Sequence, residues 1–247
     1  MIPQLTNQEA TSYHGNPNLK SIGHKHEWTP EQIIEYQKCM GDPIYFIEAY
    51  CMIVTLDTGL QPFKLYDCQK EKVNFIMDNR RCILMEGRQQ GKTVTAAACI
   101  LHYTIFQDSK TVAIMANKSN AAREVLARYQ IMYEHLPIWM QQGVKTWNKG
   151  DVDLENGSRV FTAATTSSGI RGKSVNWLYI DEAAIIPNNV AEEFFTSVYP
   201  TISAGETTKI LLTSTPLGYN HFWKFWNDSV EKRNGFENMF IHYSRIP

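Results

Sequence analysis

The chain has 247 residues, 43% of them hydrophobic and 20% charged, and its 24 basic and 25 acidic side chains leave a formal net charge of −1. This balance excludes a protein that coats DNA or an anionic membrane with a strongly basic surface, so a polyanion must meet a local patch. The five cysteines lack C-x-x-C spacing and predict buried, reduced thiols. No apolar run is as long as a membrane span and no signal sequence is evident, so we expect a soluble intracellular protein.

The first 66 residues predict an arm followed by a helical segment. Residues 1–28 are polar and turn-rich, and we expect a flexible arm. Thr29 and Pro30 then supply a helix cap and a first helical residue. An apolar stretch follows and is broken by TGLQPF, so we expect 29–66 to form a helical lid segment.

The next part of the chain alternates between apolar strands and helices. The predicted strands are 81–85, 111–116, 177–180 and 209–215, and the predicted helices are 92–106, 120–136 and 188–199. Asn156-Gly157 predicts a hairpin between two extended runs. The alternation favours a parallel sheet covered on both faces. We assign 67–218 to this core and 219–247 to a C-terminal segment that packs with the lid.

The stretch MEGRQQGKTV, residues 85–94, ends like a phosphate-binding loop. In such loops glycines let backbone N–H groups point at the phosphates, and a helix N-terminus adds positive potential. Lys92 would reach the β- and γ-phosphates, and the Thr93 hydroxyl would lie on magnesium. The usual pattern places a glycine where this chain has Glu86, with Gly87 following it. The strand before the loop and the helix after it supply the required context.

Two further strand ends carry polar residues. WLYI is followed by Asp181 and Glu182, an aspartate that can hold a magnesium shell and a glutamate that can polarise an attacking water. The alternative is an exposed acidic pair that caps the next helix. LLTSTP ends in hydroxyl residues that could sense the γ-phosphate, although Ser/Thr-Pro is also an ordinary turn. ANKSN (116–120) approaches the guanine-reading N-K-x-D pattern, but Asn120 replaces its aspartate, so a GTPase is rejected.

The order LYDCQ, GRQQGKT, IRGKSVNWLYIDEAA and LLTSTP resembles the ATPase domain of large terminase subunits of tailed double-stranded DNA bacteriophages, most closely the myovirus type. The resemblance extends from about Tyr45 to the C-terminus. It implies an α/β fold of the RecA-like (ASCE) P-loop NTPase class, with a mainly parallel sheet flanked by helices and a small helical lid. It also implies ATP and Mg²⁺ as cofactors.

The resemblance implies roles for individual residues. The family's loop often reads R-Q-x-G-K-[ST] without the first glycine, so Glu86 is no defect, and Arg88 matches an arginine that contacts phosphates. Gln69 matches a glutamine that reads the adenine edge; the alternative is an exposed residue at a helix start. Thr93 and Asp181 are the implied magnesium residues. The implied nucleotide-binding residues are Gln69, Gly87, Arg88, Gln89, Gln90, Gly91, Lys92, Thr93, Asp181, Thr213, Ser214 and Thr215, the last three as a coupling motif.

The implied catalytic residues are Glu182, Arg88 and Arg171. Arg171 matches an arginine finger donated to a neighbouring subunit, and a guanidinium that neutralises transition-state charge can raise the rate by roughly 10³ to 10⁵. The alternative is a solvated loop arginine between Gly169 and Gly172. Action within one subunit or between two stays open.

The implied function is ATP-driven packaging of double-stranded DNA into a procapsid. The implied partners are double-stranded DNA, the portal protein, the small terminase subunit and further copies in a ring, without a membrane. The implied location is the host cytoplasm and, transiently, the procapsid. Nothing matches the family's nuclease carboxylates, so we expect no DNA cleavage by these residues. Lys145, Lys149 and Arg159 are candidate DNA contacts.

Two alternative functions differ in what they require. A helicase-type translocase shares the Asp-Glu pair but needs a second RecA-like domain, for which 247 residues leave no room. A nucleotide-gated assembly module would bind ATP without hydrolysis, and Lys92 together with Glu182 argues against it.

Overall fold

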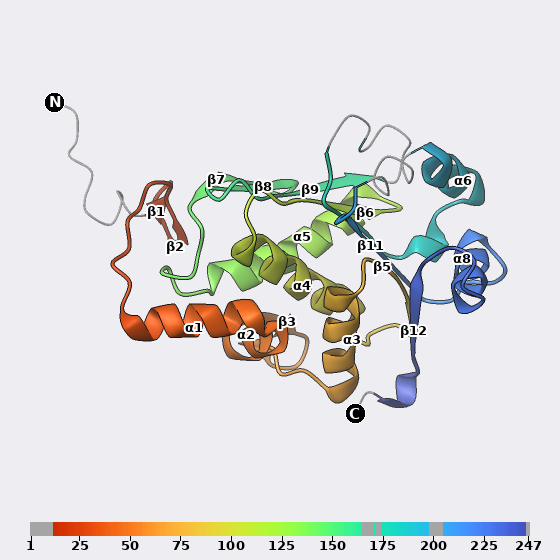
Figure 1. Ribbon diagram of the computed structural model, residues 1–247, viewed down its shortest axis with the longest axis horizontal. Helices are drawn as coiled ribbons and strands as arrows, with labels where there is room; N and C mark the ends of the chain where they lie inside the picture. The colour runs from red at the N-terminus through yellow and green to blue at the C-terminus, as the bar shows by residue number, and fades with distance from the viewer. Residues whose placement is uncertain (1–11, 165–169, 171–173, 198–204, 246–247) are drawn as a thin grey trace.

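The computed structural model describes residues 12–164, 170, 174–197 and 205–245, and within them an eight-stranded sheet runs through the molecule (Figure 1). Its spatial order is β12-β5-β11-β10-β6-β9-β8-β7. The strands are β5 (Arg81–Glu86), β6 (Thr111–Ala116), β7 (Val144–Trp147), β8 (Asp151–Leu154), β9 (Arg159–Ala164), β10 (Trp177–Ile180), β11 (Lys209–Ser214) and β12 (Glu237–Ile241). Neighbours from β12 to β9 pair in parallel, whereas β8 and β7 are antiparallel. The predicted mainly parallel sheet is confirmed.

Helices cover both faces of this sheet. One face carries α3 (Asp67–Asp78), α4 (Lys92–Phe106) and α5 (Ser119–Glu134), and the other carries the short η1 (Ala183–Ile185), α6 (Asn188–Ser197) and α8 (His221–Val230). Alternate strand residues point to opposite faces. In β6, for example, Val112 and Ile114 join the core under α4 and α5, while Ala113 and Met115 join the core under η1 and α6. This double burial explains the continuous apolar strand sequences.

The segment 29–66 packs directly on the core. It contains α1 (Pro30–Gly41), α2 (Pro43–Tyr50) and a hairpin of β3 (Met52–Thr55) and β4 (Gly59–Pro62). Thr29 and Gln32 form a capping box at the start of α1, as the sequence predicted for its N-terminus. Phe46 of α2 is fully buried in the same hydrophobic cluster as the alanines of α4. The helical segment therefore shares its core with the sheet.

Part of the predicted flexible arm is folded. β1 (Ser12–Tyr13) and β2 (Asn16–Lys20) form an antiparallel hairpin. Leu19 is only 1% exposed, and the Lys20 backbone N–H donates to Gln141 Oε1 at 3.0 Å. One apolar anchor in an otherwise polar stretch gives no periodic signal, so composition alone predicted an unstructured arm.

We predicted that the C-terminal segment packs with the lid, but in the structure it lies against the core. β12 pairs in parallel with β5, from Glu237 opposite Cys82 to Ile241 opposite Glu86. The following short helix η2 (Tyr243–Arg245) brings the Arg245 guanidinium to the Glu71 carboxylate of α3 at 2.7 Å. A half-exposed edge strand of five residues has a weak sequence pattern, which is why it was missed.

None of the helices in the described part of the chain combines the length and apolar character needed to span a bilayer.

Candidate nucleotide-binding site

Three neighbouring parallel strands deliver the polar residues to one edge of the sheet. β5, β11 and β10 are adjacent and parallel, so their carboxyl ends coincide. The loop 87–91 follows β5, Asp181 and Glu182 follow β10, and β11 ends at Ser214 with Thr215 directly after it. Ligands of open α/β sheets bind at this edge. The three segments singled out from the sequence thus converge.

The loop after β5 is a tight turn that leads into α4. Gln89 and Gly91 both have positive φ, +61° and +76°, and α4 begins at Lys92. Gln90 folds its side chain across the turn, where Oε1 accepts from the Gly87 N–H at 2.9 Å. A Cβ at Gly91 would lie 2.4 Å from Gln69 Nε2, so only glycine fits there without movement. The Gln90 side chain and the close approach of Gln69 to Gly91 therefore hold the backbone of this loop in a tight turn.

Asp181 links the loop to the sheet through two hydroxyls. Its Oδ2 accepts from Thr93 Oγ1 at 3.0 Å, and its Oδ1 accepts from Thr213 Oγ1 at 2.9 Å. The Tyr179 hydroxyl lies 3.2 Å from Thr213 Oγ1. A hydroxyl beside a carboxylate is the oxygen donor set that Mg²⁺ takes from protein, with water and phosphate as further ligands. Thr93 and Asp181 therefore fit a magnesium site.

Glu182 is held between the loop lysine and the end of β11. Its Oε1 accepts from Lys92 Nζ at 2.6 Å, and its Oε2 accepts from the N–H and hydroxyl of Thr215 at 3.4 and 3.3 Å. Burial disfavours the charged carboxyl, but Lys92 and Thr215 outweigh it and lower the pKa of Glu182. Its backbone has φ +51°, a conformation rare outside glycine and typical of functional strain. Glu182 is thus an ionised carboxylate held in one orientation by contacts to both of its oxygens.

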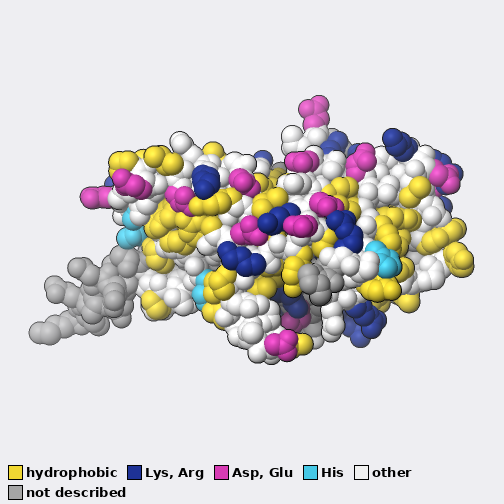
Figure 2. Space-filling model, turned by 90° about the horizontal axis from the view of Figure 1, so that it is seen from below, with side chains coloured by type: hydrophobic (Ala, Val, Ile, Leu, Met, Phe, Trp, Pro, Cys, Tyr) yellow, Lys and Arg dark blue, Asp and Glu magenta, His cyan; other side chains and the backbone are white. Residues whose placement is uncertain are grey.

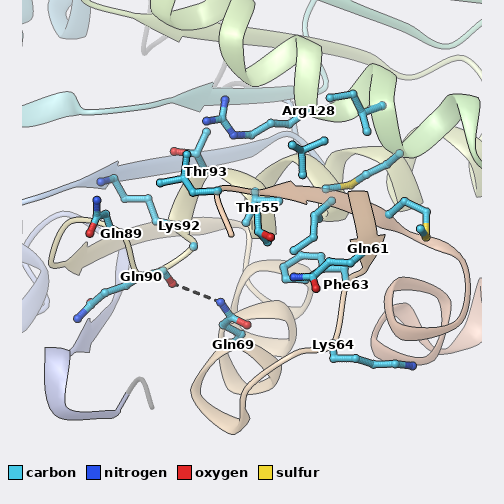
Figure 3. Close-up of a pocket in the computed structure, with 18 of the residues that line it drawn as sticks. Thr55, Gln61, Phe63, Lys64, Gln69, Gln89, Gln90, Lys92, Thr93 and Arg128 are labelled. Carbon is cyan, nitrogen blue, oxygen red and sulfur yellow. Dashed lines mark hydrogen bonds between the residues drawn. The ribbon is translucent and has the colours of Figure 1, made fainter. Parts of the chain in front are cut away.

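A cavity of about 930 Å³ opens beside these residues (Figure 3). The phosphate-loop residues and Glu182 line one end, and the β3–β4 hairpin and α5 line the rest. Ile53, Phe63 and Met132 make that second end apolar, and Arg128 of α5 contributes a cation to the wall. The cavity therefore offers a cationic end and an apolar end, which suits a nucleotide.

The sequence did not predict that the β3–β4 hairpin and α5 would line the site, or that Lys72 and Glu86 would form an ion pair beside it. No sequence pattern marked β3–β4 or Arg128, because their approach to the loop is a product of long-range packing. Lys72 of α3 and Glu86 of β5 form an ion pair of 2.7 Å beside the loop, with both side chains fully buried. Glu86 was noticed as a departure from the loop pattern, but nothing in the sequence linked it to Lys72.

Three residues with a predicted role, Gln69, Arg88 and Arg171, differ from one another in whether and where the structure places them. Gln69 is 4% exposed, and its amide already bonds the Gln90 carbonyl and the Tyr66 N–H, at 3.4 and 3.1 Å. Its adenine-reading role stays a prediction. Arg88 is exposed at the cavity wall. Arg171 lies outside the described residues.

Of the candidate DNA contacts, Lys145 lies on β7, Lys149 in the turn between β7 and β8, and Arg159 on β9. Lys145 and Lys149 are exposed, whereas Arg159 is bonded to Asp151 through its Nε at 2.9 Å. Figure 2 shows one face of the molecule, on which Lys and Arg side chains are interspersed with Asp and Glu. The charge on that face follows the near-neutral composition and forms no broad basic field.

Comparison with known proteins gives a consistent family and fold. The family described as terminase large subunit, T4likevirus-type, N-terminal, matches residues 83–246. The chain is similar to the large terminase of bacteriophage HK97, with a TM-score of 0.68 and 17% identity over 83% of this chain and 43% of that one. It is also similar to the ATPase domain of the Thermus phage P74-26 large terminase, with a TM-score of 0.55 and 19% identity over 72% and 81%.

A third similar structure is the large terminase of a thermophilic bacteriophage in complex with ATP-gamma-S. Its TM-score is 0.56 at 11% identity, over 74% of this chain and 46% of that one. The chain thus spans less than half the length of this terminase and of the HK97 protein. At these identities the likeness concerns the fold, and it confirms the predicted RecA-like α/β class.

Proposed function

Because the chain belongs to the T4likevirus-type family of large terminase subunits, we propose that it is an ATP-hydrolysing motor domain for DNA packaging. The observation that carries this proposal is the meeting of Thr93 with Asp181 and of Lys92 with Glu182 at one end of the cavity. They bring the lysine and hydroxyl of the phosphate loop beside the two acidic residues, which are the groups that an ATP-hydrolysing site combines.

The phosphates would bind at the N-terminus of α4. The N–H groups of the loop and the first turn of α4 have no helical partner and attract anions. Lys92 is 7% exposed and lies at the cavity wall, so its ammonium would pair with the β- and γ-phosphates. Arg88, exposed at the same wall, would add a second cation. The adenosine part would lie toward the apolar end under the β3–β4 hairpin.

The magnesium of the substrate would be held by Thr93 and Asp181, and when bound it neutralises charge that develops on the phosphates. The oxygens of Thr93 and Asp181 would then serve the ion instead of each other. Thr213 keeps Asp181 oriented from the other side, because its hydroxyl donates to Oδ1 at 2.9 Å. The carboxylate therefore stays in place when its loop partner changes.

Glu182 would act as the general base. While Lys92 holds Oε1, the carboxylate is occupied, and transfer of Lys92 to the phosphates leaves Oε1 as a free acceptor. Oε1 would then orient a water and take its proton as the water attacks the γ-phosphorus, while the bond from the γ-phosphorus to the bridging oxygen breaks and ADP leaves. Thr215 keeps the opposite oxygen fixed. The Glu182 carboxylate would thus be bonded to Lys92 in the absence of ATP and would be free to accept a proton when ATP is bound.

The end of β11 would relay this change to the rest of the domain. Ser214 Oγ accepts from the Ala184 N–H at 3.0 Å, which ties β11 to the turn behind Glu182. A movement of Glu182 therefore acts on β11 and η1 together. This supports the coupling role predicted for Thr213 to Thr215.

The partners follow from the same proposal. The motor would act on double-stranded DNA, as a ring with the portal protein and the small terminase subunit, in the host cytoplasm and on the procapsid. Arg171 would complete a neighbouring subunit's site as a finger. In that case activity per subunit depends on assembly.

The test is ATP turnover and ATP binding by the wild-type chain, Glu182→Gln and, as a charge-matched control, Glu71→Gln. We expect Glu182→Gln to lower turnover by about 10²–10⁴-fold while ATP still binds, and Glu71→Gln to behave as wild type. Turnover by Glu182→Gln equal to wild type would exclude the proposed base. Rescue of Arg171→Ala by added Glu182→Gln chains supports a finger acting between subunits, and absence of rescue excludes it.

A further inference from the structure

Lys72 and Glu86 form a charged pair where an apolar pair would pack as well. Both side chains are 0% exposed, and Lys72 Nζ lies 2.7 and 3.0 Å from the two oxygens of Glu86. Removing two charges from water is expensive, and hydrophobic replacement of such a pair is often neutral or stabilising. The pair is therefore poorly explained by stability alone.

The same ammonium also reaches the phosphate loop. Lys72 Nζ lies 3.4 Å from the Gln90 carbonyl oxygen, and Gln69 Nε2 donates to that oxygen at 3.4 Å (Figure 3). Both donors belong to α3. The carbonyl of Gln90 is thus turned toward α3 by a cation and an amide, one helical turn apart.

The direction of this carbonyl fixes the direction of the next N–H. A trans peptide is planar and its C=O and N–H groups point in opposite directions. The described residues contain no cis peptide. With the Gln90 carbonyl toward α3, the Gly91 N–H therefore points away from α3, and both residues line the cavity. That N–H is a donor that a phosphate could take.

We propose that Lys72 and Glu86 are positioning residues for nucleotide phosphates: Glu86 anchors Lys72, and Lys72 with Gln69 aims the Gly91 N–H into the cavity. This inference rests on the proposed function and deepens it. In a loop with glycine at position 86 no such anchor could exist, so the departure from the usual pattern has a defined role. Because the pair is neutral as a whole, it orients the loop and leaves the positive potential to Lys92 and α4.

The charge state of the pair is consistent with this role. Burial lowers the pKa of Lys72 and raises the pKa of Glu86, and each partner's charge opposes the shift of the other. Removing one partner leaves the other buried without its counter-charge. Single substitutions are therefore expected to harm folding, and the double substitution Lys72→Met with Glu86→Leu removes both charges at similar volume.

The decisive comparison is between this double variant, wild type and Lys209→Met. Lys209 is a matched control, because its ammonium donates to the Met77 and Asn79 carbonyls at 2.8 and 2.7 Å, at the far end of α3. Thermal unfolding without nucleotide, the Kd for ADP by calorimetry, and kcat and KM for ATP are measured well below the unfolding temperature.

We expect the double variant to unfold near the wild-type temperature and to bind ADP roughly tenfold more weakly or worse, the range for a lost hydrogen bond to a phosphate. KM for ATP should rise with little change in kcat, because the N–H contacts phosphate in both ground and transition states. Lys209→Met should lose stability and keep the wild-type Kd. An unchanged Kd in a folded double variant overturns the inference alone, whereas absence of ADP binding by wild type overturns the proposed function too.

A second measurement needs no substitution. In wild-type protein labelled with ¹⁵N-glycine, the Gly91 amide resonance should shift strongly on addition of ADP, while the exposed Gly15 amide should not. A Gly91 resonance that stays in place while ADP binds overturns the inference even if the double variant fails to fold.

Discussion

Replacement of Gly91 by alanine tests the packing of the phosphate loop directly. The residue has φ +76°, and a Cβ there would lie 2.4 Å from Gln69 Nε2. Alanine in the left-handed region costs about 1–2 kcal/mol. The Gln69 amide must also move, which breaks its bonds to the Gln90 carbonyl and the Tyr66 N–H. At about 0.5–1 kcal/mol for each lost hydrogen bond, the two bonds add about 1–2 kcal/mol, and the whole effect is roughly 2–4 kcal/mol.

A matched control separates the clash from the backbone term. Gly15 has φ +78° and nothing within 4 Å of its Cβ position, so Gly15→Ala carries the left-handed penalty alone. The loss of chain entropy in the unfolded state is the same for both variants and cancels in their difference. Gly91→Ala should therefore be less stable than Gly15→Ala by about 1–2 kcal/mol, the value of the two lost bonds.

The assay is urea unfolding of both variants without nucleotide, followed by calorimetric titration with ADP. We expect Gly91→Ala to bind ADP more weakly than wild type and Gly15→Ala to bind it equally well. Equal unfolding free energies for the two variants would refute the reasoning, because they would show that Gln69 does not occupy the space beside Gly91.

Other expectations follow from buried groups around the site. Thr213→Val removes the hydroxyl that donates to Asp181, so it should lower the unfolding free energy by about 1–3 kcal/mol in urea; an unchanged midpoint contradicts that contact. Burial raises the pKa of Cys82 and Cys99 to about 12, so Ellman's reagent at pH 8 should label them only after unfolding, and rapid labelling of native protein contradicts this. The pKa of Glu182 is lowered by folding, so its ionic contribution is present above its unfolded pKa and is lost as pH falls through the folded value. The stability difference between wild type and Glu182→Gln should therefore shrink in acid, and a difference that does not fall as the pH is lowered contradicts the sign.

Elements with continuous apolar sequence were predictable, because burial on both faces leaves a simple pattern. β6 and α4 have the predicted bounds, and the hairpin turn at Asn156 and Gly157 is where the dipeptide placed it. Convergence of Asp181 and Glu182 with the loop followed from parallel strand topology. Elements that depend on partners elsewhere in the chain were not predictable, since β12 is an edge strand with mixed exposure.

The site shows the same division. The loop and acidic residues carry recognisable local spacing, whereas the cavity wall does not. Arg128 and the β3–β4 hairpin reach the cavity through packing of α5 on the sheet, and Lys72 meets Glu86 across two elements. No periodicity in a single sequence encodes those approaches. The predicted role of Arg171 falls outside the described residues and stays a prediction.

The pairing of β12 with β5 gives the domain a mechanical property. The two strands run in the same direction, and Ile241 of β12 pairs with Glu86, after which the phosphate loop starts. A tensile load on the chain beyond β12 would act along the strands, so it would shear the whole row of hydrogen bonds at once instead of peeling them singly. Such an attachment is stiff, and Arg245 reinforces it on Glu71 of α3. A displacement of the phosphate loop would therefore move the C-terminal segment by a similar amount, and the reverse would also hold.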